Sequence, residues 1–262
     1  MNLEQNLSLI KYAPGFFTIS ILIFMGLGWF FGHLQIKRKQ ESKVVDSLAG
    51  AIFGLSALIL GFAFSMALEH QNVRAENIRM QTIAFDNVIH SIKYLQPDDQ
   101  TQIRLHLQEL LDLRLNIYKD ADSMTEINAR TANLLKKLRH LSELIPKATA
   151  EASADNQPVI AETLTVQFRD LVNAINTDII KIKSHPPRIL MFFLYVLLSI
   201  GALLIGYTMA INSERDWFLV TLYIVLMGFG LHVIMTLEYP NMLMPTEFNK
   251  DLITLKNSLF DK

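Results

Sequence analysis

Residues 43–95 read KVVDSLAGAIFGLSALILGFAFSMALEHQNVRAENIRMQTIAFDNVIHSIKYL. The part from 47 to 68 carries no charged residue and is long enough to cross about 30 Å of hydrocarbon as a helix. Charged residues follow from Glu69 onward, but the apolar residues keep helical spacing, at Val73, Met80, Ala84, Val88, Ile92 and Leu95. No proline lies in the stretch, and no glycine follows Gly61. We therefore predict one helix of about 50 residues that leaves the membrane and continues into a water-soluble region.

Four stretches of the chain lack formal charge and are long enough to span a membrane: residues 12–36, 47–68, 189–213 and 217–237. The block between the second and third stretches has nearly equal numbers of acidic and basic residues and shows helical spacing without strand-like alternation. We therefore predict an all-α integral membrane protein with four transmembrane helices and a helical-bundle insert between spans 2 and 3.

This prediction divides the chain into four parts. They are a first hairpin over 1–68 with spans at about 14–34 and 45–68, a water-soluble insert over 69–188, a second hairpin over 189–240 with spans at about 189–211 and 217–237, and a tail over 241–262. Within the insert, we expect Pro146 to end a helix that begins near Thr125, and Pro186-Pro187 to mark the entry into span 3.

Small residues form a stripe on one face of span 2. Its members are Ser47, Gly50, Gly54, Ala57, Gly61 and Ser65. Because glycine weakens a helix, this pattern indicates that another backbone approaches closely. The stripe fits tight packing against another span or another subunit, and it also fits a pore-lining face.

Two ionisable residues lie in or at the end of span 4. His232 is either a functional group that faces a cavity or a neutral histidine hydrogen-bonded to a neighbouring helix. Glu238 lies at the expected membrane interface, where a carboxylate can cap a helix or pair with a basic residue.

The loop between spans 1 and 2 is basic, with Lys37, Arg38, Lys39 and Lys43. Basic loops are usually cytoplasmic, which would place the insert on the extracytoplasmic side. The same four residues could also bind anionic lipid headgroups. Basic residues flank spans 2 and 3 on the opposite side, at Arg74, Arg79, Lys181, Lys183 and Arg188. The side of the insert therefore stays undecided.

The sequence contains no pattern typical of an enzyme. It has no cysteine, so disulfides, thiolate catalysis and cysteine-ligated metals are excluded. It has neither an HExxH motif, nor a glycine-rich phosphate loop, nor a G-x-S-x-G motif. We predict no catalytic residue, metal site or cofactor, and the nearly neutral insert does not indicate nucleic-acid binding.

Several segments together carry a resemblance to a known family: Val44–Gly50, Leu55–Phe62, the helix positions Asn77, Ala84 and Asn87, Leu113–Tyr118, Leu237–Pro240 and Met244-Pro-Thr. With these segments the chain resembles the bestrophin-like family of uncharacterised bacterial membrane proteins. Bestrophins are pentameric anion channels with four spans and a cytosolic helical region, and their second span lines the pore.

The resemblance implies a homo-oligomer, by analogy a pentamer, in a bacterial inner membrane, with small anions as the transported species. The nearest series for a pore constriction is Leu58, Phe62 and Met66. The alternative function is a non-conducting membrane scaffold or sensor whose insert binds a partner or a small ligand. The basic loop favours an orientation opposite to that of bestrophins.

Overall fold

The structure is a computed structural model that describes residues 7–36, 44–182, 188–211 and 217–260. All of the regular elements in these ranges are helical, which confirms the prediction of an all-α protein. The elements are α1 (Leu7–Ile36), α2 (Val44–Ser91), the 3₁₀ turn η2 (Ile92–Tyr94), α3 (Pro97–Leu115), α4 (Met124–Glu151), α5 (Gln157–Glu162), α6 (Leu164–Ile182), α7 (Arg188–Ile211), α8 (Trp217–Glu238), α9 (Pro240–Leu243), α10 (Pro245–Phe248) and α11 (Lys250–Phe260).

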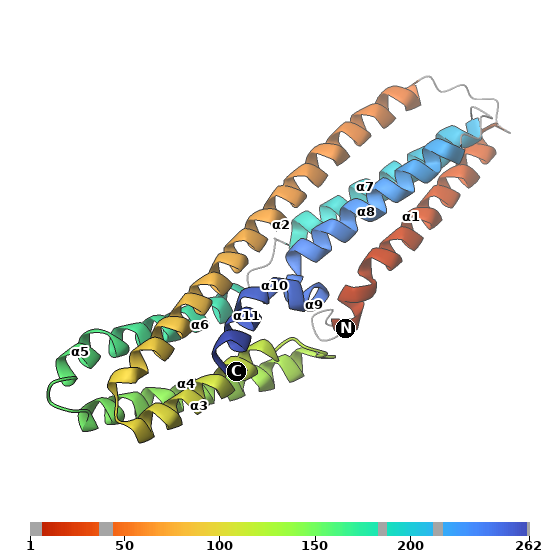
Figure 1. Cartoon of the computed structure of the whole chain (residues 1–262). Coiled ribbons are helices and arrows are strands. Elements are labelled where there is room, and N and C mark those ends of the chain that lie inside the picture. Colours follow the sequence, from red (N-terminus) through yellow and green to blue (C-terminus); the bar gives the residue numbers. More distant parts are fainter. Residues whose placement is uncertain (1–6, 37–43, 183–187, 212–216, 261–262) are drawn as a thin grey trace. The chain divides into compact units, whose positions relative to one another are not determined.

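Helix α2 runs without interruption for 48 residues and contributes to both compact units of the chain (Figure 1). The apolar unit comprises residues 9–70 and 185–238. The polar unit comprises residues 71–184 together with both ends of the chain, 1–8 and 239–262. The change from one unit to the other falls just after Glu69, the first charged residue that follows the uncharged stretch of α2.

The apolar unit contains the four predicted spans. Helices long and apolar enough to cross a membrane lie at Pro14–Gln35, Gly50–Tyr94, Phe192–Ile211 and Val220–Glu238, which confirms the prediction of four transmembrane helices. Its core draws on α1, α2, α7 and α8. The buried residues are Phe17, Ile21, Met25, Ala63, Ala67, Leu194, Leu198, Ala202, Val220, Leu231 and Ile234.

Helices α1 and α7 approach each other at backbone distance through glycine. A Cβ atom at Gly28 would overlap the carbonyl oxygen of Leu203, and one at Gly206 would overlap that of Met25. One turn further along α1, a Cβ at Gly32 would lie 2.6 Å from that of Ala210. Each helix therefore presents small residues four apart at the crossing, the pattern that lets membrane helices pack by van der Waals contact.

The polar unit includes the part of α2 from Gln71 onward, with α3 packed on α4 and α5 on α6. The apolar stripes of these helices are buried, including Phe85, Ile103, Leu107, Leu134, Leu141, Leu171 and Ile175. The expected helix end at Pro146 is wrong, because α4 continues to Glu151. Pro146 lies on the exposed side of α4, while Ile145 and Ala148 are buried, so packing of the inner face holds the helix together beyond the proline.

The C-terminal residues pack onto the insert. Leu252 and Leu255 of α11 are buried, and α11 contacts α3. The Lys256 Nζ lies 2.8 Å from a carboxylate oxygen of Asp112, and Arg104 donates a hydrogen bond to the carbonyl oxygen of Leu259. The last helix is thus part of the same folded unit as residues 71–184.

Replacing Gly28 by alanine should destabilise the membrane unit by about 1–3 kcal/mol, because the added methyl group forces the α1 and α7 backbones apart. Gly26→Ala is the matched control, since a Cβ at Gly26 meets nothing within 4 Å. The measurement is thermal or denaturant unfolding of the detergent-solubilised protein. Equal stability of the two variants would contradict the close α1–α7 contact.

Candidate functional site

The small-residue stripe of span 2 is not covered by any part of the described chain. A Cβ atom at Gly50, Gly54 or Gly61 would meet nothing within 4 Å. Ala57 and Ser65 are also exposed. The backbone of Ser47 belongs to α2, but its side chain lies outside the described residues. Within the part of the chain that the structure describes, no residue therefore approaches these positions.

A different set of small residues faces the core on α2. Ser56, Ala63 and Ala67 are buried, with exposed fractions of 3% or less. The hydroxyl of Ser56 donates a hydrogen bond to the carbonyl oxygen of Ile52, at 2.7 Å. The spacing of seven and four residues places all three on one face, away from the glycine stripe. Within the chain, α2 therefore packs through serine and alanine and leaves its glycines free.

The three residues predicted as a constriction differ in exposure. Leu58 and Phe62 are 54% and 55% exposed, which is high for large apolar side chains, whereas Met66 is half-buried. Leu58 and Phe62 lie on the open side of the helix beside the glycines. The open side of α2 thus combines a smooth glycine surface with two bulky apolar side chains.

The two predicted polar residues of span 4 have different surroundings. Glu238 is 4% exposed, and its carboxylate lies 3.1 Å from the Nδ1 atom of His70 on α2. This contact joins the C-terminal end of α8 to the middle of α2, and His70 was not among the predicted site residues. His232 is exposed on α8.

Some predicted features lie outside the described residues. They are the basic loop residues Lys37, Arg38, Lys39 and Lys43, and the Pro186-Pro187 pair. In the part of the chain that the structure describes, no group of three or more His, Asp or Glu side chains is placed to hold a metal ion.

A buried ionic contact connects three helices of the polar unit, and sequence reasoning missed it. Arg114 of α3 is 2% exposed; its Nη2 donates to the carboxylate of Asp178 on α6 at 2.7 Å, and its Nε donates to the amide oxygen of Gln81 on α2 at 2.8 Å. The available signal was a charged residue on the apolar side of α3, between Leu110 and Tyr118. A buried charge needs a partner, but spacing alone does not identify one 64 residues away.

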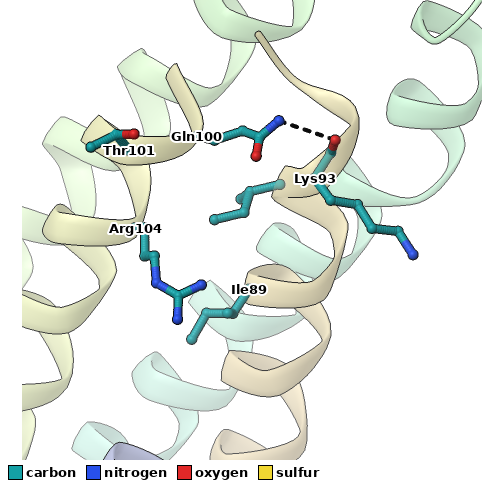
Figure 2. Close-up of a pocket in the computed structure, with 6 residues that line it drawn as sticks. Ile89, Lys93, Gln100, Thr101 and Arg104 are labelled. Atoms are coloured by element: carbon teal, nitrogen blue, oxygen red, sulfur yellow. Dashed lines mark hydrogen bonds between the residues drawn. The ribbon is translucent and has the colours of Figure 1, made fainter. Parts of the chain in front are cut away.

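A shallow pocket lies at the other end of the insert, between η2 and the first turns of α3 (Figure 2). Gln100 donates its amide to the carbonyl oxygen of Lys93, at 3.1 Å. The two cationic side chains at the pocket have partners already, since Arg104 bonds the carbonyl oxygen of Leu259 and Lys93 lies over the ring of Tyr94. We therefore do not assign a ligand site to this pocket.

Solved structures share this arrangement of helices over nearly the whole chain. A crystal structure of a bacterial bestrophin homologue from Klebsiella pneumoniae matches with a TM-score of 0.62 at 14% identity, covering 97% of this chain and 98% of that chain. The chain has the bestrophin fold. Two crystal structures of a membrane protein with single glycine-to-alanine substitutions also match. The first has a TM-score of 0.67 at 13% identity and covers 93% of this chain and 97% of that chain. The second has a TM-score of 0.65 at 12% identity and covers 96% of both chains.

The predicted resemblance to bestrophin-like proteins is thus confirmed at the level of the fold. No family model matches the chain, and no curated protein sequence matches it either. The four helices of this chain that are long and apolar enough to cross a membrane agree with the predicted number of spans.

Replacing Asp178 by asparagine should lower the free energy of unfolding by about 3–5 kcal/mol, because it leaves the guanidinium of Arg114 buried without its counter-charge. Asp170→Asn is the matched control on the same helix, since Asp170 is exposed and its replacement should change stability by less than about 0.5 kcal/mol. Denaturant unfolding followed by far-ultraviolet circular dichroism measures both. Equal effects would contradict a structural role for the buried pair.

Proposed function

We propose that this protein is an oligomeric ion channel for small anions in which the α2 helices of several copies surround a central pore. The observation that carries the proposal is the fold shared with a bacterial bestrophin homologue over 97% of this chain. A match that includes the four spans and the insert together supports a similar mode of assembly more strongly than a match of the spans alone.

The surface of α2 supports this assembly. Only 17% of its most apolar window is buried within the chain, against 44% of the corresponding window of α7. The glycines of the stripe remain free, although glycine is costly in a helix unless a close approach uses it. A ring of copies, with α2 innermost, would give this face either a helical neighbour or a water-filled lumen.

The chemistry of the open face would set the character of the pore. Residues 47–68 of α2 carry no formal charge, so the lining would be apolar or weakly polar. Leu58 and Phe62 project from the same side and would form the narrowest part, where an apolar constriction controls conduction by excluding water. We propose that they, rather than the half-buried Met66, make the constriction.

The orientation in the membrane is a separate part of the proposal. The loop between spans 1 and 2 has four basic residues, and the insert side of spans 2 and 3 has five. Because the two sides of the membrane carry nearly equal numbers of basic residues, the positive-inside rule does not decide the orientation. A bestrophin-like channel places its helical region in the cytosol. We therefore propose a cytoplasmic insert, against the lean of the basic loop taken alone, in a bacterial inner membrane.

Cysteine labelling tests the orientation directly, because the chain has no native cysteine. Ser153→Cys in the insert should resist a membrane-impermeant maleimide in intact cells and react after permeabilisation, whereas Ser42→Cys in the basic loop should react from outside. The reverse pattern would contradict the proposed orientation and would favour a sensor or scaffold with an extracytoplasmic insert.

The channel itself is tested by purified protein in planar bilayers, where we expect an anion-selective current from the wild type. Gly61→Trp should abolish that current, because the indole fills either the lumen or the contact between neighbouring α2 helices. Gly26→Trp on α1 is the matched control, since Gly26 is also uncovered within the chain but would lie away from the axis.

The oligomeric state of each variant, from light scattering, then separates the two roles of the stripe. If the Gly61→Trp protein assembles but does not conduct, the stripe lies in the lumen. If it is monomeric, the stripe lies between subunits. A Gly61→Trp oligomer that conducts like the wild type would contradict the axial position of α2. A well-folded wild-type oligomer without conductance would contradict the channel and favour the non-conducting scaffold.

A further inference from the structure

The buried ionic contact of the polar unit includes hydrogen-bond donors that have no acceptor. Three fully buried nitrogen atoms lack a partner among the described residues: Nη1 of Arg114, Nε2 of Gln81 and Nδ2 of Asn77. Their side chains are 2%, 0% and 9% exposed, respectively. Buried polar atoms in folded proteins are almost always paired, so three such atoms in one region call for a physical explanation.

Two of these donors belong to one set of hydrogen bonds, and the third lies one helical turn away. Gln81 accepts the Nε–H of Arg114 through its amide oxygen, so its amide nitrogen must be the free end of the side chain. Asn77 precedes Gln81 by four residues and therefore lies next to it on the same face of α2. Two amide groups from α2 and one guanidinium from α3 thus leave N–H groups without an acceptor in a region bounded by α2, α3 and α6.

The nature of the free groups points to the kind of ligand. All three are donors, whereas a single water molecule has two lone pairs and therefore accepts at most two of their hydrogen bonds. A ligand that only accepts would satisfy all three groups at once. Tyr118 does not serve as an anionic acceptor for these donors, because burial raises the pKa of its phenol and keeps it protonated at neutral pH.

We propose that the insert binds a monoatomic anion of the halide class between Arg114, Gln81 and Asn77. The single carboxylate of Asp178 engages Nη2 of Arg114 and leaves Nη1 for the anion. The site lies wholly within residues 71–184 and does not depend on the proposed pore. It would make folding of the insert sensitive to the halide concentration.

The test uses the purified full chain in detergent, melted in sodium chloride and in sodium gluconate at equal ionic strength. Chloride should raise the melting temperature by several degrees in a saturable manner, because a ligand that binds only the folded state stabilises it. Gln81→Glu should remove the chloride effect, since the carboxylate still accepts from Arg114 Nε but replaces the free donor by an acceptor. Gln102→Glu, at an exposed position of α3, should keep the full effect.

Asn77→Leu provides a second, uncharged variant that removes one donor, and it decides the question in the same way if Gln81→Glu does not fold. Crystals of the wild-type protein grown in bromide should show an anomalous peak beside Nη1 of Arg114. Crystals of Gln81→Glu, or of Asn77→Leu if Gln81→Glu does not fold, should lack this peak. Melting temperatures that do not differ between chloride and gluconate, a chloride effect retained in both variants, or no bromide peak would each overturn the proposal and assign the free donors to water.

Discussion

The continuous backbone of α2 is the constraint on which the rest of the structure depends. In hydrocarbon every backbone amide and carbonyl must be bonded within the protein, and a helix is the simplest way to achieve this. Because no proline and, after Gly61, no glycine interrupts the segment, the same hydrogen-bond ladder extends from the apolar unit into the polar unit. One helix therefore contributes buried residues to two separate cores, one in the apolar unit and one in the polar unit.

Small residues have two different uses in this protein. On α1 and α7, Gly28 and Gly206 are required by the chain itself, since any side chain there would overlap a carbonyl oxygen of the other helix. On α2, a Cβ atom at Gly50, Gly54 or Gly61 would meet no other described residue within 4 Å. The first set stabilises the protomer, and the second set is available to other molecules, so a count of glycines per span does not by itself tell packing from function.

Sequence patterns predicted the four spans and the helical insert because these depend on properties of single segments, namely the length of uncharged stretches and the periodicity of apolar residues. Features that depend on pairs of segments were not predicted. Neither the fit of Gly28 against Leu203 nor the pairing of Arg114 with Asp178 has a signal at fixed spacing, since the partners lie far apart in the chain. The end expected at Pro146 failed for a related reason: burial of its neighbours outweighs one lost hydrogen bond.

The buried polar cluster shows how a contact that adds little net stability can still specify a packing arrangement. The hydrogen bond from Arg114 to Gln81 fixes which face of the C-terminal part of α2 turns toward α3 within the polar unit. The ion pair with Asp178 holds α6 against the same residue of α3. Because a buried charge without its partner is costly, a packing in which either helix is rotated away from Arg114 is disfavoured even where its apolar contacts are as good. The cluster therefore determines how these three helices pack, beyond what it adds to the free energy of unfolding.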